Sequence, residues 1–145
     1  MKSLKNSDKK IISEFKSFAE KEMFDLCRSI TGKGIKKSLN LIKKKFKKLS
    51  IYKIKSGSIA FDWKIPPEWN IKKAYILDKN KKKIIDFKNN NLHLVNYSIP
   101  INKILKRDEL LKKIYSLQAQ PNAIPYVTSY YKRDWGFCCD YNTKK

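Results

Sequence analysis

The spacing of the apolar residues changes near residue 50, and this change restricts the folds that the chain can adopt. Before residue 50, apolar side chains recur at every third or fourth position, which is typical of the buried stripe of an amphipathic helix. Beyond it they alternate with polar residues, which is typical of β-strands. With 145 residues and 41% hydrophobic residues, the chain can bury a core. We therefore predict an α+β protein, in which a helical pair precedes a β-rich module of five or six strands.

Two amphipathic helices are predicted before this change, over residues 8–27 and 34–48. Asp8 is a suitable cap for the first helix, and a loop over residues 30–34 with two glycines joins it to the second. A helical hairpin of this kind needs a surface on which its apolar stripe can pack. The stripe contains Ile11, Ile12, Phe15, Phe18, Ala19, Met23 and Leu26 in the first helix, and Ile35, Leu39, Ile42 and Phe46 in the second.

The second part of the chain alternates between candidate strands and residues that break them. Pro66 and Pro100 end two of the runs, because proline cannot donate a hydrogen bond to a sheet. Residues 78–81 are turn material, so the strands on either side should form a hairpin. The predicted strands cover residues 51–56, 59–63, 71–77, 84–87, 92–98 and 126–131, and one further helix covers residues 107–117.

The formal net charge of +21 suggests nucleic acid or an anionic membrane as a partner. However, only Arg28, Arg107 and Arg133 among the 34 basic residues are arginines, whereas proteins that read bases and phosphates favour the bidentate guanidinium. The lysines are spread along the chain and accompany many isoleucines and asparagines, as the codons of an AT-rich genome would produce. We therefore interpret the charge as compositional bias and predict no specific nucleic-acid partner.

The cellular compartment is predicted from the membrane, secretion and disulfide signals that the sequence lacks. No apolar run reaches the roughly 18 residues of a membrane span, and no apolar signal-peptide segment follows Met1. Cys27 stands alone, and Cys138 and Cys139 are adjacent, so neither a Cys-x-x-Cys pair nor a disulfide-type spacing occurs. These features predict reduced thiols, a cytoplasmic location and no membrane partner.

Metal ligands and catalytic bases are scarce in the sequence. A metal hydrolase needs several converging ligands, and His93 is the single histidine. His93 would also have to serve any Ser-His-acid triad, and no Gly-x-Ser-x-Gly motif is present. A thiol pair of His93 with Cys27 or Cys138 stays an alternative. In a strand His93 would share a face with Val95 and Tyr97, which favours a hydrogen-bonded structural histidine over a ligand contact. We predict no catalytic residue and no metal site in this chain.

Four segments, in order, resemble a known family. They are residues 26–34 (LCRSITGKG), residues 61–63 with 67–71 (FDW and PEWNI), residues 91–100 (NLHLVNYSIP), and residues 125–131 with 135–138 (PYVTSYY and WGFC). Together they resemble a bacterial aminopeptidase-like family of the zinc exopeptidase type, often found near surface-polysaccharide biosynthesis genes. The resemblance spans residues 15 to 138.

The resemblance implies a zinc exopeptidase-like α/β domain with a β-rich domain of unknown function inserted after its first helices, and a winged helix at the C-terminus. Residues 1–49 would be the entry helices, residues 50–131 the inserted domain, and residues 132–145 the start of the return to the peptidase-like domain. The family's metal-binding His and acidic segments follow the Trp-Gly-Phe-Cys motif. We therefore expect an N-terminal fragment that is inactive alone and holds no cofactor, the zinc being implied for the full-length family. Its expected partner is the missing C-terminal part, with a homo-oligomer as a further option.

A candidate substrate-binding group follows from the same resemblance. Residues 28–34 would border the peptidase cleft, where the guanidinium of Arg28 suits a substrate carboxylate, and their backbone N–H groups precede a helix, where anions bind. The alternatives are an Arg28 paired with a structural acid, a loop that only turns the chain, and aromatic residues that belong to the core. The predicted group is Arg28, Ser29, Thr31, Gly32, His93, Tyr130 and Trp135.

Two rival functions come from other classes of protein. The first is a basic binding module for polyanions, either nucleic acid or acidic glycan, whose binding would fall steeply with added salt. The second is an independent enzyme, which stoichiometric zinc in the purified chain would reveal.

Overall fold

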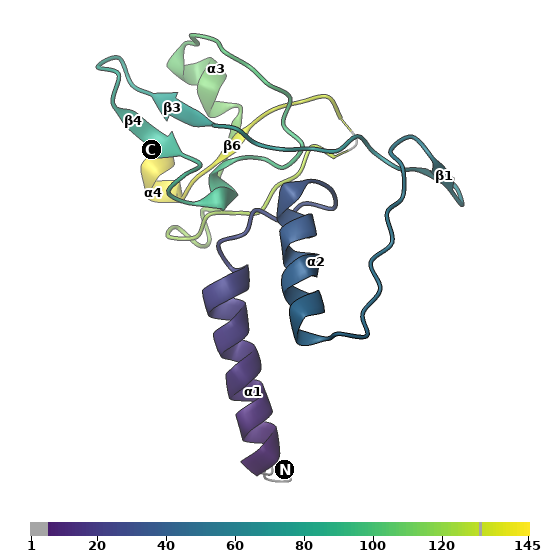
Figure 1. Ribbon diagram of the computed structural model, residues 1–145. Helices are drawn as coiled ribbons and strands as arrows, with labels where there is room; N and C mark the ends of the chain where they lie inside the picture. Colours follow the sequence, from purple (N-terminus) through teal and green to yellow (C-terminus); the bar gives the residue numbers. More distant parts are fainter. Residues whose placement is uncertain (1–5, 131) are drawn as a thin grey trace. The chain divides into compact units, whose positions relative to one another are not determined.

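The structure is a computed structural model in which residues 6–130 and 132–145 are described (Figure 1). The chain divides into two units, which we call unit 1 (residues 1–70) and unit 2 (residues 71–145). This division lies later in the sequence than the predicted domain boundary near residue 50, which stays a prediction. Helices and short two-stranded sheets occur together, so the α+β class is confirmed.

Unit 1 begins with the predicted pair of helices. Helix α1 (Asn6–Phe18) continues into the π-helix η1 (Ala19–Met23), and helix α2 (Lys33–Lys45) follows after a loop. Both predicted helices are therefore confirmed, although each ends a few residues early. The ammonium of Lys45 lies 5.0 Å from the ring centroid of Phe18, so the two helices are in contact there.

The predicted strand over residues 51–56 is wrong. This segment has no regular secondary structure, and it ends in a turn at Gly57, whose N–H donates to the carbonyl of Ile65 at 2.8 Å. The alternating pattern misled because Tyr52 and Ile54 are exposed instead of covering one face of a sheet.

A hairpin replaces the single strand predicted over residues 59–63. Strand β1 (Ile59–Ala60) pairs antiparallel with β2 (Trp63–Lys64). The turn between them is possible because Phe61 adopts a positive φ of 57°, which non-glycine residues rarely take and which a single straight strand excludes. Phe61 and Asp62 are therefore the tip of the hairpin and not its middle.

Unit 2 opens with the predicted hairpin. Strand β3 (Tyr75–Leu77) pairs antiparallel with β4 (Lys83–Asp86). The carboxylate of Asp78 stabilises the turn because it accepts hydrogen bonds from the N–H groups of Asn80 and Lys82, both at 2.8 Å. This hairpin and its turn are confirmed, although its first strand begins at Tyr75 and not at residue 71 as predicted.

The strand predicted over residues 92–98 is wrong at its start. Residues Asn91–His93 form a 3₁₀ turn, η2, because the side chain of Asn90 accepts a hydrogen bond from the N–H of Leu92 at 2.9 Å. Tyr97 has a φ of 64°, which interrupts any extended run before residue 98.

The strand predicted over residues 126–131 is wrong, because the described part of this segment contains a single isolated β-bridge. Thr128 forms an isolated parallel bridge with Asn96, and the neighbouring described residues are irregular. Tyr131, the last residue of the predicted strand, lies outside the described residues.

The helix predicted over residues 107–117 is shorter than expected. Helix α3 (Arg107–Leu111) is followed by strand β5 (Ile114–Tyr115), which pairs in parallel with β6 (Phe137–Cys138). A short helix α4 (Tyr141–Lys144) ends the described chain. The described strands thus form three separate two-stranded sheets, so one module of five or six paired strands is not what the structure contains.

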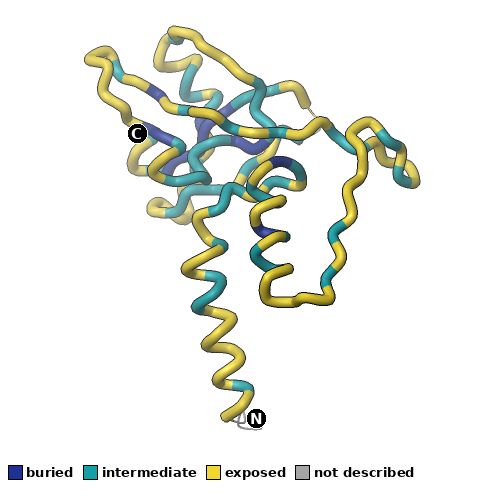
Figure 2. Tube along the Cα trace, in the orientation of Figure 1, coloured by how far each residue is buried: buried dark blue, intermediate teal, exposed yellow. Residues whose placement is uncertain are grey.

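The hydrophobic core lies in unit 2, where β3, β4, β5 and β6 supply its side chains (Figure 2). Ile76 and Ile85 face each other across the hairpin and are almost fully buried. In unit 1, by contrast, only Gly32 and Ser38 are buried among the described residues. The core residues are Ile76, Ile85, Ile114, Phe137 and Cys139, with Ala74, Leu94, Leu110, Leu111 and Trp135 packed against them.

Candidate functional site

The loop between α1 and α2 is fastened to residues 67–70 of the same unit. The hydroxyl oxygen of Thr31 accepts a hydrogen bond from the N–H of Trp69 at 3.1 Å and donates to the carbonyl of Pro67 at 3.5 Å. Gly32 is buried with a φ of 95°, and a Cβ atom there would lie 2.2 Å from the carbonyl oxygen of Trp69. The two backbones therefore approach so closely that only glycine fits.

The first turn of α2 is capped from the same segment. Asn70 accepts a hydrogen bond on its side-chain oxygen from the N–H of Lys33 at 2.8 Å, and its amide donates to the carboxylate of Glu68 at 3.3 Å. Because a side chain already satisfies this N–H group, that position of the helix N-terminus is not open to an anion. These contacts give the loop a structural role, and its predicted role toward a substrate stays a prediction.

Arg28 and Ser29 lie at the start of this loop. The side chain of Arg28 is exposed and makes no salt bridge within the part of the chain that the structure describes. The alternative of a structural acid paired with Arg28 therefore receives no support. Ser29 is half-buried beside it. Four of the predicted substrate-binding residues thus belong to unit 1, and the other three belong to unit 2.

His93 ends the η2 turn of unit 2, and its ring is hydrogen-bonded. Its Nδ1 atom lies 2.8 Å from the carbonyl oxygen of Cys138. Because a carbonyl oxygen only accepts hydrogen bonds, Nδ1 carries the hydrogen and the neutral ring keeps Nε2 as an acceptor. The prediction that His93 shares a strand face with Val95 and Tyr97 is wrong, because His93 lies in a 3₁₀ turn. The contact favours a structural histidine, since the ring meets the backbone of Cys138 and not its thiol.

The thiols of unit 2 are poor nucleophiles. Cys138 and Cys139 have no exposed surface, and both are free. Burial, followed by the neighbouring Cys139, raises the pKa of Cys138 to about 11. Burial also raises the pKa of Cys139 and, in unit 1, that of Cys27. Because the thiolate is the reactive form, these environments count against the alternative of a thiol pair with His93.

Tyr130 and Trp135 are half-buried among aromatic neighbours. The ring of Tyr130 packs edge-on against Tyr97, with 5.1 Å between the ring centroids. Trp135 packs edge-on against Phe137 at 6.5 Å, and the ammonium of Lys113 lies 5.7 Å from the centroid of the Trp135 ring. Trp135 thus borders the core, which was the alternative interpretation of this residue.

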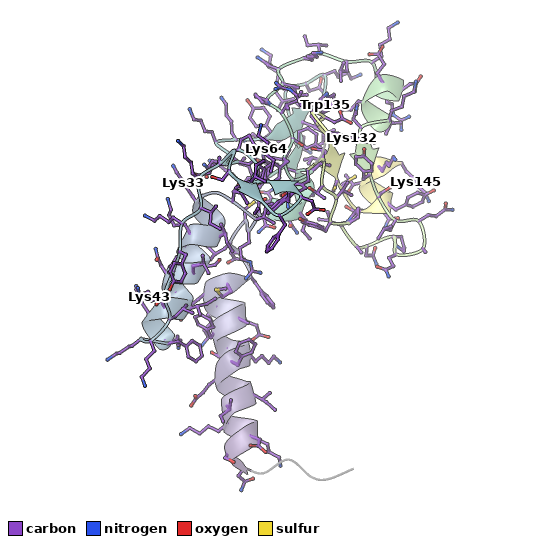
Figure 3. The ribbon with its side chains drawn as sticks, turned by 90° about the vertical axis from the view of Figure 1, so that its right-hand side faces the viewer. Lys33, Lys43, Lys64, Lys132, Trp135 and Lys145 are labelled. Carbon is purple, nitrogen blue, oxygen red and sulfur yellow. The ribbon has the colours of Figure 1, made fainter. Side chains whose placement is uncertain are left out.

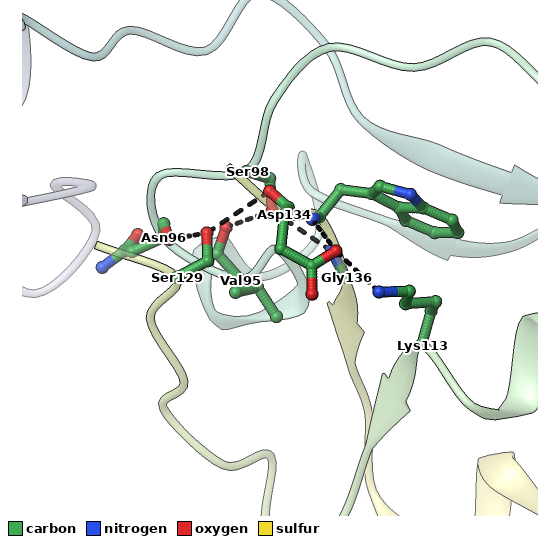
Figure 4. Close-up of polar contacts among 8 residues, drawn as sticks. Val95, Asn96, Ser98, Lys113, Ser129, Asp134 and Gly136 are labelled. Carbon is green, nitrogen blue, oxygen red and sulfur yellow. Dashed lines mark hydrogen bonds and ion pairs between the residues drawn. The ribbon is translucent and has the colours of Figure 1, made fainter. Parts of the chain in front are cut away.

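An ion pair beside Trp135 was not predicted from the sequence (Figure 4). The ammonium of Lys113 lies 2.6 Å from a carboxylate oxygen of Asp134, and the same oxygen accepts a hydrogen bond from the N–H of Trp135 at 2.8 Å. The hydrogen bond from Lys113, followed by the one from the Trp135 backbone, lowers the pKa of Asp134. No motif or spacing in the sequence pairs residues this far apart.

Two serines join the segments around this ion pair (Figure 4). The hydroxyl of Ser98 donates to the carbonyl of Val95 at 2.6 Å and accepts from the N–H of Gly136 at 3.3 Å. The hydroxyl of Ser129 lies 3.2 Å from the carbonyl oxygen of Asn96, to which it donates. Because both hydroxyls donate to backbone carbonyls, these contacts hold the loops of unit 2 together.

We expect unit 2 to lose stability as the pH falls below about 4. A carboxylate whose pKa is lowered by folding stabilises the fold above its unfolded pKa of about 3.9, and this contribution is lost as the pH falls through the folded pKa. Asp86, Asp134 and Asp140 all have this sign. Thermal unfolding across a pH series should therefore show a shallower acid dependence for Asp134→Asn. Asp62→Asn, in the exposed hairpin turn of unit 1, is the control, and equal slopes for the two variants would refute the assignment.

The described residues do not fit a zinc site. No group of three or more His, Cys, Asp or Glu side chains lies close enough together in residues 6–130 and 132–145 to hold a metal ion. His93 directs one ring nitrogen to a backbone carbonyl, and both neighbouring thiols are buried. None of the helices in the described residues is long and apolar enough to cross a membrane.

Comparison with known proteins identifies the family. Residues 68–145 match the family described as "Domain of unknown function (DUF2172)", and the chain belongs to it. Over 121 residues the chain is 46% identical to a protein of Clostridium acetobutylicum named "Putative polysaccharide biosynthesis protein with aminopeptidase-like domain". This alignment covers 83% of the chain and 28% of the relative. The predicted resemblance to an aminopeptidase-like family linked to polysaccharide biosynthesis is therefore confirmed.

A solved structure gives the same result for the fold. It is titled as a crystal structure of a "putative peptidase" from Clostridium acetobutylicum, and it is 42% identical to this chain with a TM-score of 0.82. The match covers 94% of this chain and 33% of that chain. The chain thus spans about a third or less of the proteins that it resembles.

Proposed function

We propose that this chain is the DUF2172-bearing part of an aminopeptidase-like protein of surface-polysaccharide biosynthesis and has no hydrolytic activity by itself. In this proposal unit 1 is the surface on which the rest of the peptidase-like domain packs, and any zinc is bound by that other part. The names of the two relatives support the class of protein, and the scarcity of metal ligands in the described residues supports the division of labour.

The observation that carries the proposal is the uncovered apolar stripe of α1. Ile11, Ile12 and Phe15 are 64%, 53% and 69% exposed, although their spacing is that of a buried helix face. Phe24, beyond the helix, is 62% exposed. Both α1 and η1 carry charges of both signs. Asp8 and Glu14 lie among the lysines of α1, and Glu20 and Glu22 lie beside the lysine of η1. An apolar stripe with mixed charges beside it suits a protein surface.

An exchange between relatives tests the proposal. The matching segment of the Clostridium acetobutylicum relative would be replaced by this chain, and amino-acid release from peptides and aminoacyl anilides would be measured. We expect hydrolysis by the chimaera whenever the relative itself hydrolyses the substrate, and none by the 145-residue chain. Phe15→Asp should abolish soluble, active chimaera, because a buried carboxylate without a partner costs several kcal/mol.

The matched control is Ser13→Asp, which adds the same charge to an exposed position of α1 that lies outside the stripe. It should leave the chimaera active. Stoichiometric zinc or peptide hydrolysis in the isolated chain would overturn the proposal. Equal effects of the two aspartates would overturn the docking role of α1.

A further inference from the structure

A long segment of unit 1 carries basic residues and no acidic ones. Between Asp25 and Asp62 the sequence contains no Asp or Glu, whereas α1 and η1 just before it contain several. Compositional bias explains abundant lysine, but it does not explain why acidic residues are confined to other segments. The segment's basic residues are Arg28, Lys33, Lys36, Lys37, Lys43, Lys44, Lys45, Lys47, Lys48, Lys53 and Lys55.

The lysines at the end of this segment are accompanied by exposed apolar side chains. We use the name basic apolar strip for residues 43–55, which comprise the last turn of α2 and the irregular segment after it. Lys33 and Lys43 lie toward opposite ends of α2, so the charge extends along the helix into the strip (Figure 3). Within the strip Phe46 is 66% exposed, Tyr52 is 86% exposed and Ile54 is 67% exposed.

We propose that the basic apolar strip binds an anionic lipid surface. Lysines near a membrane surface attract anionic headgroups, and apolar side chains between them gain free energy by entering the boundary between headgroups and acyl chains. This needs no membrane-spanning helix, and none of the described helices is long and apolar enough to be one. It revises the expectation of no membrane partner, which rested on the absence of a span and of a signal peptide.

The chemistry of the strip favours lipid over nucleic acid. Aromatic side chains such as Phe46 and Tyr52 can stack on bases, but the aliphatic Ile54 has no π-face to stack. The cations of the strip are all lysines, which are point charges, whereas arginine predominates where bases and phosphates are read bidentately. The basic apolar strip also differs from the α1 stripe because its charges are all positive, whereas the mixed charges beside the α1 stripe suit contact with a protein surface. The proposal therefore stands apart from the function proposed above.

The test is flotation of the full 145-residue chain with phosphatidylcholine vesicles that contain or lack phosphatidylglycerol. Binding should require phosphatidylglycerol and weaken with salt. Phe46→Ser with Ile54→Ser should lower vesicle binding at least tenfold while leaving retention on single-stranded DNA unchanged. Lys44→Gln with Lys47→Gln should lower the vesicle partition constant about 30-fold, because each lysine near the surface contributes a factor of about five.

The matched control is Lys79→Gln with Lys82→Gln, which removes the same charge from exposed positions in unit 2. It should change vesicle binding less than threefold. Equal losses in the two lysine variants would mean that net charge alone is responsible, and the proposal would be wrong. It would also be wrong if the Phe46 and Ile54 variant bound vesicles like the original chain, or if the chain bound DNA but not vesicles.

Discussion

Gly32→Ala is expected to release the loop between α1 and α2 from residues 67–70. The backbone of Gly32, with φ 95° and ψ −174°, is in a region that is essentially confined to glycine, so alanine would cost about 1–3 kcal/mol in strain alone. Its Cβ would also overlap the carbonyl of Trp69 at 2.2 Å. Separating the two segments then sacrifices the hydrogen bonds of Thr31 and Asn70, at about 1 kcal/mol each. We expect local stability to fall by about 4 kcal/mol.

Local opening of this loop is measurable because trypsin cleaves after Arg28 and Lys33, which flank Gly32. When opening is fast relative to cleavage, the cleavage rate follows the population of the open form. A loss of about 4 kcal/mol should therefore raise cleavage at these two sites by two to three orders of magnitude. The rates would be followed by mass spectrometry of the peptides released.

Gly57→Ala is the matched control for this prediction. Gly57 also has a positive φ, of 86°, but a Cβ there would meet no atom within 4 Å. Its substitution should strain its own turn and leave cleavage after Arg28 and Lys33 unchanged. If Gly32→Ala and Gly57→Ala gave the same cleavage pattern, the close approach to Trp69 would not be what holds the loop.

The helices and the β3–β4 hairpin were predictable because short-range patterns determine them. An apolar stripe at helical spacing specifies α1 and α2 wherever they pack, and Asp78 with its neighbours forms a turn through bonds within five residues. The exposure of the α1 stripe was predictable for the same reason. An amphipathic helical pair has an apolar face that needs a further surface to pack on, and Ile11, Ile12 and Phe15 of α1 are exposed.

Strands β5 and β6 and the irregular backbone of residues 92–98 were not predictable from local sequence patterns. Alternation over residues 92–98 resembles a strand, yet the side chain of Asn90 and the positive φ of Tyr97 outcompete an extended backbone. The pairing of β5 with β6 depends on a parallel contact across more than twenty residues, which alternation within either segment cannot encode.

The contacts of the candidate site could be anticipated only in part from the sequence, and the role of its residues toward a substrate stays a prediction. Thr31 and Gly32 stood out because a glycine-containing loop before a helix is unusual, but their partner segment at residues 67–70 is not visible from the loop itself. The Lys113–Asp134 ion pair has no sequence signal, since lysine is abundant and any of many could have been the partner. The resemblance to a family singled out the segments that contain these residues. The contacts between the segments are known only from the structure.

Phe137→Ala is expected to remove most of the stability of unit 2. Phe137 is 7% exposed, packs with Ile76, Ile85, Ile114 and Cys139, and belongs to the strand that pairs with β5. Truncating a buried phenylalanine to alanine costs about 3–5 kcal/mol through lost transfer free energy and the cavity left behind. Because whole domains are stable by only about 5–15 kcal/mol, a core this small has little reserve.

Amide hydrogen exchange, read peptide by peptide, is the measurement for this variant. Protection in peptides that contain Ile85 and Cys139 should fall by at least two orders of magnitude, because these amides exchange through opening of the same core. Phe61→Ala is the control, since it makes the same truncation at a side chain that is fully exposed in the β1–β2 hairpin. It should change protection in unit 2 by less than a factor of about three, as surface substitutions usually do. If the two truncations had equal effects, Phe137 would not be the residue on which the core of unit 2 depends, and the stability of that unit would have to come from its loop hydrogen bonds instead.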